Sequence, residues 1–214
     1  MRVKICGLTR PEGVDAAAEA GASYLGFMFF PPSPRSLSIE AGQALMSRVP
    51  KGIAKVAVTV DPDDALADQV SQLPVDFLQL HGHETLQRID DLRNRTGLKI
   101  IKAIGVRSAE DLSQIATYTP AVDQLLIDAK PPKDATRPGG NAISFDWNLL
   151  AGRIWDVPWL LAGGLTPDNL AEAVQITGAS QLDVSSAVET SPGIKDPAKI
   201  HAFMEAARAP APIP

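Results

Sequence analysis

The segment Val3-Lys4-Ile5-Cys6-Gly7-Leu8-Thr9-Arg10-Pro11 decides between the two α/β architectures that the pattern of the chain permits. Residues 3–6 form an apolar run typical of a buried parallel strand, and Pro11 opens an amphipathic stretch that predicts a helix. A doubly wound sheet that binds a dinucleotide carries Gly-x-Gly-x-x-Gly between its first strand and first helix. The single glycine here does not supply that pattern, so the segment favours a (β/α)₈ barrel.

The same order of apolar run and amphipathic stretch recurs along the whole chain. The predicted strands are residues 3–6, 24–29, 54–60, 77–81, 99–104, 124–128, 159–162 and 181–185. The predicted helices are residues 11–20, 38–49, 62–73, 84–95, 108–118, 146–152, 167–177 and 196–207. This alternation predicts one α/β domain, a single (β/α)₈ TIM barrel over residues 1–208. We expect a long loop over residues 129–144 and a disordered, Pro-rich tail over residues 209–214.

Composition limits the classes of function. The chain has 214 residues, of which 45% are hydrophobic and 21% charged, and this is typical of one globular domain. A net charge of -5 and an isoelectric point of about 5.2 exclude the generally basic surface of a nucleic-acid-binding protein. One cysteine excludes an intrachain disulfide and a Cys-rich metal site. Because there is no signal-peptide pattern and no run of about 20 apolar residues, we expect a cytoplasmic protein without a nucleic-acid or membrane partner.

Polar residues and glycines gather at one end of the predicted strands. The active site of a (β/α)₈ barrel lies at the carboxyl ends of its strands, so these residues are the candidates for chemistry. In chain order they are Cys6, Arg35, Gln79, His81, Asp128, Gly163, Gly164, Ser185 and Ser186.

The ends of the seventh and eighth predicted strands favour a phosphate site. Backbone N–H groups at Gly163-Gly164 can approach an anion, and Ser185-Ser186 adds hydroxyl donors and can begin a short helix. These two loops are the usual phosphate site of the fold, and we expect no lysine in either of them. The alternative is that they hold ordinary turn glycines and helix-capping serines.

Cys6 and Asp128 are the candidates for proton transfer. Cys6 ends the first strand, where its sulfur is either a small buried hydrophobic group or a base at the barrel mouth. A free thiol near pKa 8.5 supplies only a few per cent of thiolate at neutral pH, so a base would need help from a nearby cation or helix N-terminus. Asp128 follows an apolar run and is either a general acid or base, or a salt-bridge or capping group. A metal site is disfavoured because no carboxylate or histidine cluster surrounds it in the sequence.

Each of three further side chains has two possible interpretations. Arg35 lies in a loop that can reach the mouth, where its fork can hold a carboxylate, or it is an ordinary surface arginine. His81 can orient a substrate, or it is a satisfied histidine at a strand end. Lys102 lies inside the fifth strand with no visible partner, so a structural role is favoured over a Schiff-base lysine.

Short motifs follow one another in a specific order along the chain. They are Lys4-Ile5-Cys6-Gly7-Leu8, Gly26-Phe27-x-Phe29, Ser33-Pro34-Arg35-Ser36, Gln79-Leu80-His81-Gly82-x-Glu84, Asp128, Gly139-Gly140 before Phe145-Asp146-Trp147, Leu161-Ala162-Gly163-Gly164-Leu165, Asp183-Val184-Ser185-Ser186-x-Val188-Glu189, and Pro192-Gly193-x-Lys195-Asp196. Each motif is weak alone. In this order, over nearly the whole chain, they closely resemble the phosphoribosylanthranilate isomerases of tryptophan biosynthesis.

The resemblance implies a (β/α)₈ isomerase of the aldose–ketose type that uses no metal and no organic cofactor. It would convert N-(5-phosphoribosyl)anthranilate to 1-(2-carboxyphenylamino)-1-deoxyribulose 5-phosphate by an Amadori rearrangement. By resemblance, Asp128 is the general acid that opens the ribose ring, and Cys6 is the general base that removes the C2 proton. Arg35 would hold the anthranilate carboxylate, Gln79 and His81 would bind substrate, and the glycine and serine loops would hold the phosphate. Monomer and homodimer both stay open.

Three departures from the family pattern bear on loops and packing. Gly139-Gly140-Asn141-Ala142 stands where the family usually has Gly-Gly-Thr-Gly, and Val56-Ala57-Val58-Thr59 where it often has Val-Gly-Val-Phe. Ala187 replaces the glycine that usually follows the serine pair. We expect these changes to alter loop closure and substrate affinity more than the type of reaction.

Two rival functions are consistent with a phosphate-binding barrel. An aminoaldose isomerase of the histidine-pathway type would use a pair of aspartates and usually two phosphate sites, but the first strand here offers cysteine. A non-catalytic phosphate-ligand-binding barrel would keep Gly163-Gly164 and Ser185-Ser186 and would need neither Cys6 nor Asp128.

Overall fold

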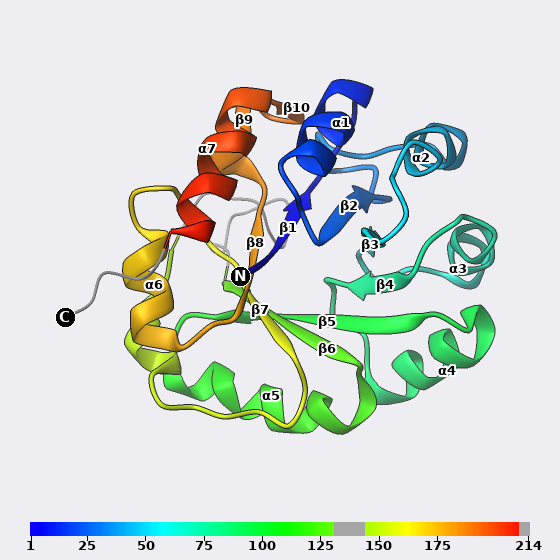
Figure 1. Ribbon diagram of the computed structural model, residues 1–214. Helices are drawn as coiled ribbons and strands as arrows, with labels where there is room; N and C mark the ends of the chain where they lie inside the picture. Colours follow the sequence, from blue (N-terminus) through cyan, green and yellow to red (C-terminus); the bar gives the residue numbers. More distant parts are fainter. Residues whose placement is uncertain (131–143, 210–214) are drawn as a thin grey trace.

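Eight parallel strands close into a barrel in the computed structural model, which describes residues 1–130 and 144–209 (Figure 1). The strands follow one another in sequence order, and β1 (Arg2–Cys6) pairs with both β2 (Tyr24–Met28) and β8 (Gln181–Val184). The other barrel strands are β3 (Ala54–Thr59), β4 (Phe77–Leu80), β5 (Lys99–Val106), β6 (Gln124–Ala129) and β7 (Trp159–Leu161). The predicted (β/α)₈ barrel is therefore confirmed, and every predicted strand overlaps an observed one.

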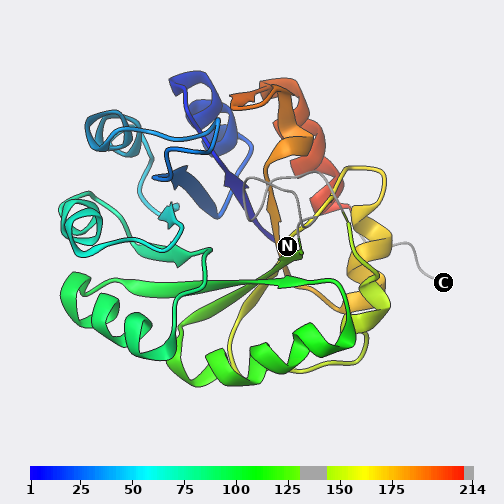
Figure 2. The ribbon, with the colours of Figure 1, turned by 180° about the vertical axis from the view of Figure 1, so that it is seen from behind.

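Helices surround the barrel on its outer side (Figure 2). They are α1 (Pro11–Glu19), α2 (Ile39–Met46), α3 (Asp64–Ser71), α4 (Leu86–Thr96), α5 (Ser113–Tyr118), α6 (Leu170–Thr177) and α7 (Pro197–Arg208). Side chains of Ser38, Asp63 and Thr85 accept hydrogen bonds from backbone N–H groups in the first turns of α2, α3 and α4. These caps satisfy donors that have no partner within the helix, so they fix where each helix begins.

Some helix predictions were wrong at their boundaries. The helix expected over residues 146–152 is one 3₁₀ turn, η3 (Trp147–Leu150), and α5 is preceded by another, η1 (Ala109–Leu112). The helix expected from residue 167 begins at Leu170, because the Asn169 side chain accepts a hydrogen bond from the Thr166 N–H and holds the preceding turn. A two-stranded antiparallel hairpin, β9 (Glu189–Ser191) and β10 (Ile194–Lys195), was not predicted, since strands this short show no periodic pattern.

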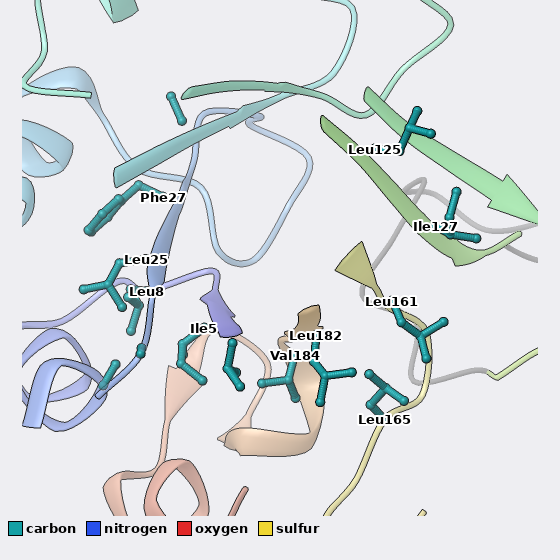
Figure 3. Close-up of a cluster of buried hydrophobic side chains, with 14 of the residues drawn as sticks. Ile5, Leu8, Leu25, Phe27, Leu125, Ile127, Leu161, Leu165, Leu182 and Val184 are labelled. Carbon is teal, nitrogen blue, oxygen red and sulfur yellow. The ribbon is translucent and has the colours of Figure 1, made fainter. Parts of the chain in front are cut away.

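Side chains alternate along each strand between two apolar cores. The outer core lies between the strands and the helices, and it includes Ile5, Leu25, Ile127 and Leu182 (Figure 3). The inner core fills the barrel and includes Cys6 and Val58. Because neighbouring residues of a strand point to opposite faces, both faces of these strands are buried.

Polar side chains also lie inside the barrel, and they are paired. Gln181 accepts hydrogen bonds from the Tyr24 hydroxyl at 2.8 Å and from Gln124 Nε2 at 3.1 Å. One layer nearer the carboxyl ends, the fully buried Lys4 Nζ lies 2.7 Å from Asp183 Oδ1. The interior is therefore a packed core with satisfied polar groups at its base.

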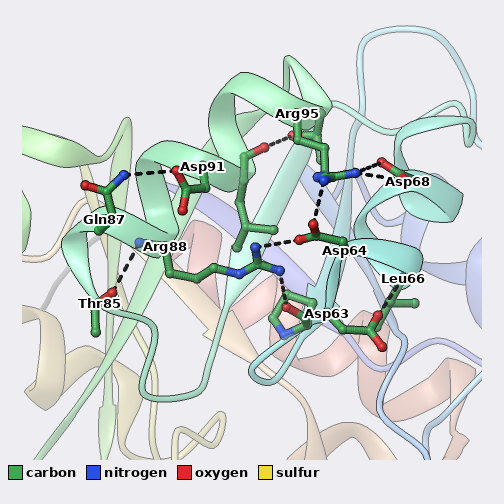
Figure 4. A network of polar contacts seen from close by, with 12 residues as sticks. Asp63, Asp64, Leu66, Asp68, Thr85, Gln87, Arg88, Asp91 and Arg95 are labelled. Atoms are coloured by element: carbon green, nitrogen blue, oxygen red, sulfur yellow. Dashed lines mark hydrogen bonds and ion pairs between the residues drawn. The ribbon is translucent and has the colours of Figure 1, made fainter.

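Charged side chains join the outer faces of α3 and α4 (Figure 4). Arg88 lies 2.7 Å from Asp64, and Arg95 bonds both Asp64 and Asp68. These exposed ion pairs line a surface groove, and because solvent screens them, each contributes little to stability.

Parts of two predicted segments lie outside the described residues. They are most of the long loop, with its Gly139-Gly140-Asn141-Ala142 motif, and residues 210–214 of the tail. In the described part of the chain, no helix has the length and apolar character needed to span a membrane.

Candidate active site

Cys6 ends β1 with its side chain inside the barrel. It is paired in register with Gly26 of β2, and a Cβ atom at Gly26 would lie 3.0 Å from Cys6 Sγ and 3.1 Å from Lys4 Nζ. Gly26 therefore leaves the space that the thiol and the lysine share. The interpretation of Cys6 as a small buried hydrophobic group is incomplete, because a cation lies in the same space.

Opposing effects set the charge of the thiol. Burial raises the pKa of Cys6, and the nearby Lys4 and Lys195 ammonium groups oppose that rise only in part. For Lys4, burial acts to lower the pKa, but Asp183 and Cys6 outweigh it, so the lysine stays charged. The resting group is therefore a neutral thiol beside a fixed cation.

Lys4 and Asp183 were not predicted as functional residues. The signal that could have found them is the strand alternation, because Lys4 stands two residues before Cys6 and Asp183 two residues before Ser185. The predicted closed barrel implies that β1 pairs with β8, but the register that sets Lys4 opposite Asp183 could not be seen in the sequence.

Asp128 lies near the end of β6 with a relative exposure of 7%. Its Oδ1 accepts a hydrogen bond from the Ala129 N–H at 2.8 Å, and its Oδ2 lies 3.5 Å from His81 Nε2. Gly163 has a φ of +87°, and a Cβ atom there would lie 2.7 Å from the Ala129 nitrogen and 3.1 Å from Asp128 Oδ1. A glycine is thus required beside the carboxylate, for its backbone angle and for space.

Gln79 and His81 reach toward Asp128 from β4. Gln79 Nε2 lies 3.4 Å from His81 Nδ1. Strand β5 lies between β4 and β6, and its Gly105 is paired in register with Asp128. Gln79 is buried, and its Oε1 has no partner among the described residues. A buried acceptor without a partner is rare in proteins, so this oxygen is available for a ligand hydroxyl.

Arg35 is buried, with a side-chain exposure of 3%, so the alternative of an ordinary surface arginine is wrong. Its Nε and Nη2 donate to the two carboxylate oxygens of Glu189 at 2.7 and 2.8 Å. Its aliphatic carbons lie over Gly7, where a Cβ atom would overlap Arg35 Cδ and where φ is +77°. Arg35 is therefore beside the end of β1, as expected from its loop.

The two predicted phosphate loops have irregular backbones. Gly163 and Gly164 both have positive φ, and the Gly164 carbonyl accepts a hydrogen bond from Asn169 Nδ2 at 2.9 Å. The Ser185 hydroxyl donates to the Cys6 carbonyl at 3.0 Å, and a 3₁₀ turn, η4 (Ser186–Val188), follows it.

Neither predicted phosphate loop contains a lysine, but a lysine from another segment lies against one of them. Lys195 Nζ lies 2.9 Å from the Ser185 carbonyl oxygen and 3.2 Å from its hydroxyl. The β9–β10 hairpin brings this lysine back onto the loop, and Lys195 was missed because it stands ten residues later in the chain.

The candidate residues form two groups around the barrel mouth. Cys6, Arg35 and Ser185 are linked at the β1 and β8 side, whereas the group at the β4 to β7 side consists of Gln79, His81, Asp128 and Gly163. Lys102 belongs to neither group, because its ammonium pairs with Glu84 at 2.7 Å, and this supports its structural role. Within the residues that the structure describes, no three His, Cys, Asp or Glu side chains gather as a metal site requires.

Comparisons with known proteins cover nearly the whole chain. The family model described as N-(5'-phosphoribosyl)anthranilate (PRA) isomerase matches residues 3–206. The N-(5'-phosphoribosyl)anthranilate isomerase of Cereibacter sphaeroides is 56% identical over 209 residues, which cover 97% of this chain and 99% of that protein.

Solved structures agree with this match. Phosphoribosyl anthranilate isomerase from Thermotoga maritima is 32% identical with a TM-score of 0.85, covering 97% of this chain and 98% of that one. A phosphoribosyl anthranilate isomerase in complex with reduced 1-(o-carboxyphenylamino)-1-deoxyribulose 5-phosphate is 30% identical with a TM-score of 0.83 and the same coverage. Because the match extends from the first strand into the last helix of a closed barrel, the chain belongs to the N-(5'-phosphoribosyl)anthranilate isomerase family.

Proposed function

We propose that this protein converts N-(5-phosphoribosyl)anthranilate to 1-(2-carboxyphenylamino)-1-deoxyribulose 5-phosphate. One observation carries the proposal: a thiol beside a buried lysine and a carboxylic acid group lie at the carboxyl ends of β1 and β6, at one mouth of a barrel of this family. An acid and a base on different strands can act on different atoms of one sugar.

The first chemical step is the opening of the ribose ring. Asp128 donates its proton to the ring oxygen while the C1–O bond breaks, and the lone pair of the anthranilate nitrogen forms the C1=N bond of a protonated Schiff base. His81, 3.5 Å from Asp128 Oδ2, supports the carboxyl group and contacts the sugar with Gln79. Asp128 acts as the acid in this step and becomes a carboxylate.

The second step is the removal of the C2 proton. The positive imine nitrogen acidifies the neighbouring C–H bond, so a modest base suffices. The thiolate form of Cys6, which exists once the thiol has lost its proton to solvent, takes the C2 proton, the C–H electron pair forms C1=C2, and the C=N pair returns to nitrogen. The resulting enolamine tautomerises to the C2 ketone: the C2 hydroxyl loses its proton, its O–H electron pair forms C2=O, and the C1=C2 pair takes a proton at C1. Atoms and electrons balance without metal, cofactor or co-reactant, and we propose that none is used.

In this proposal Arg35 holds the anthranilate end of the substrate, and the loops after β7 and β8 hold its phosphate. Three N–H groups of Arg35 are not used by Glu189, and two of them can bind the anthranilate carboxylate with charge-assisted bonds. Backbone N–H groups of Gly163, Gly164, Ser185 and Ser186 bind the phosphate, with Lys195 nearby. We propose a cytoplasmic enzyme with this phosphorylated small molecule as its partner, and light scattering will distinguish monomer from homodimer.

The test is turnover of the anthranilate substrate. We expect the purified protein to change the fluorescence of N-(5-phosphoribosyl)anthranilate, with the C2 ketone of the product visible by carbon NMR. Cys6→Ser should keep the fold and lower kcat by at least about 10²-fold. Turnover only of an aminoaldose lacking the anthranilate group would support the histidine-pathway type of enzyme, and binding without turnover would support a non-catalytic barrel. Either result would overturn the proposed function.

A further inference from the structure

Three charged side chains form a buried cluster beside the barrel mouth. Glu189 lies between Arg35 and Lys195, at 2.7 Å from Arg35 Nε and 2.8 Å from Lys195 Nζ. Side-chain exposures of 3%, 4% and 2% show that water screens none of the three strongly. Burial acts to raise the pKa of Glu189, but the two neighbouring cations outweigh it, so the pKa is lowered overall. The cluster therefore contains two cations around one carboxylate.

The charge balance of this cluster differs from that of the other buried ion pairs. Lys4 with Asp183 and Lys102 with Glu84 each combine one cation with one carboxylate. Arg35, Glu189 and Lys195 together leave one positive charge uncompensated when both cations are protonated. A buried charge without a partner is costly, so the cluster favours the arrival of one anion.

The hairpin that carries Glu189 and Lys195 is packed against the loop that carries Arg35. Gly193, at the hairpin turn, has a φ of +86°, and a Cβ atom there would overlap the Pro34 carbonyl oxygen. The Thr9 hydroxyl donates to the Gly193 carbonyl at 2.5 Å and ties the turn to the loop after β1. The hairpin turn is thus packed against Pro34, which precedes Arg35, and is bonded to the loop after β1.

We propose that Glu189 and Lys195 are positioning residues that hold the Arg35 guanidinium by one edge, so that its Nη1–Nη2 edge selects a carboxylate on the substrate. Glu189 occupies the Nε and Nη2 donors in a two-point contact, which removes rotation of the planar group. Lys195 holds Glu189 from the other side. This inference rests on the proposed function, because it names how the anthranilate carboxylate is recognised.

The same lysine connects the carboxylate site to the rest of the machinery. Lys195 Nζ contacts the Ser185 carbonyl and hydroxyl, and that hydroxyl donates to the Cys6 carbonyl. The chain of contacts therefore runs from the carboxylate-binding arginine to the predicted phosphate serine and to the strand of the base. Loss of Glu189 should disturb the orientation of Arg35 first, because among the described residues only the two Glu189 oxygens accept hydrogen bonds from the guanidinium.

Binding of two matched ligands tests the proposal. The first is reduced 1-(o-carboxyphenylamino)-1-deoxyribulose 5-phosphate, and the second is the same compound without its carboxyl group. Calorimetry gives the ratio of the two Kd values, which measures carboxylate selectivity. We expect Glu189→Gln to lower this ratio at least about tenfold, equivalent to about 1.4 kcal/mol, while the Kd of the second ligand changes less than about threefold. Loss of the fold or of phosphate binding would raise the Kd of both ligands to a similar extent.

Glu84→Gln is the matched control, because it removes the carboxylate of another buried glutamate–lysine pair. It should leave the selectivity ratio unchanged. If Glu189→Gln does not fold, Glu189→Asp replaces it: this variant keeps the negative charge between Arg35 and Lys195 but shortens the side chain that holds the guanidinium, so the ratio should fall as well. Full selectivity in the folded variant overturns the proposal.

The outcomes separate this proposal from the proposed function. A wild-type protein that turns over its substrate but binds both ligands equally has no carboxylate site at Arg35, and this overturns the positioning role alone. A protein without turnover fails the preceding test instead. Selectivity that is high in wild type and lost in Glu189→Gln supports the proposal.

Discussion

Cys6 and Lys4 show how one strand supplies both a thiol, the proposed base, and the charge beside it. The two residues are separated by one position, so both side chains enter the barrel, and Gly26 of the neighbouring strand leaves room for them. Burial favours the neutral thiol and the lysine favours the thiolate, with burial the larger effect. The base is therefore kept protonated at rest but within reach of a cation that stabilises its charged form.

A pH titration tests this balance. Because the pKa of Cys6 is raised, the thiolate fraction should increase with pH through the range above the free-thiol value of about 8.5. Lys4→Met removes the favourable charge and should move the thiol titration to higher pH. The ultraviolet absorbance of the thiolate measures the titration directly, because the chain has one cysteine. A thiol pKa below 8.5 in the wild type would contradict this account.

Asp128→Asn keeps the shape of the side chain and removes its acidic proton. We expect kcat to fall about 10²–10⁴-fold with little change in KM, because the proton is transferred only in the transition state. Asp123→Asn is the control. Asp123 comes immediately before β6, at the amino end of the strand, and its carboxylate accepts hydrogen bonds from Arg93 and from the Ile100 N–H. It should lower stability and leave kcat unchanged. Steady-state kinetics that show only a raised KM for Asp128→Asn would make Asp128 a binding residue.

The β9–β10 hairpin is the element that completes the site. It has only five residues in strand conformation, yet it brings Glu189 to Arg35 and Lys195 to Ser185. Its turn depends on a glycine for two reasons, the positive φ and the closeness of the Pro34 carbonyl.

Gly193→Ala tests the hairpin as a unit. The substitution adds the strain of a left-handed backbone, about 1–2 kcal/mol, and also pushes the turn away from the loop of Arg35. Gly97→Ala is the matched control, because Gly97 has a φ of +66° and nothing within 4 Å of the added atom. We expect thermal unfolding to show a lower Tm for both variants, and a raised KM for Gly193→Ala alone. An equal KM in both variants would mean that the hairpin does not position the site.

At the scale of the whole molecule, paired carboxylates determine stability in acid. Burial acts to raise the pKa of Glu189, Asp111 and Asp123, but their ion pairs and hydrogen bonds lower it overall. Since their folded pKa values lie below the unfolded values of about 4, the folded state binds fewer protons in acid. Their stabilising effect is complete above the unfolded pKa and is lost as the pH falls through the folded pKa.

Urea unfolding between pH 7 and pH 3 measures this effect. We expect the free energy of unfolding to fall below about pH 4, and to fall less in Glu189→Gln than in the wild type. At pH 7 the free energy of unfolding of Glu189→Gln should be lower than that of the wild type, because the variant leaves Arg35 and Lys195 without their carboxylate. A wild-type free energy that stays constant down to pH 3 would contradict the prediction.

The sequence alone determined the barrel and the end at which its site lies. Apolar runs and capped helices are local patterns, so each strand and most helices were predictable, and Cys6, Asp128 and the glycine and serine loops all stand where a strand ends. Local rules also have limits: α6 begins three residues later than predicted, because the Asn169 side chain holds the turn before it.

The tertiary structure decided which charges meet. Lys4 contacts Asp183 across 179 positions of the sequence, and Arg35 contacts Glu189 across 154. Nothing local to these residues encodes such pairs, because they arise when the barrel closes β1 against β8 and the short hairpin folds back onto the loop after β2. The sequence therefore supplied the reacting groups and their common end of the barrel, whereas closure of the barrel supplied the partners that set their charge and orientation.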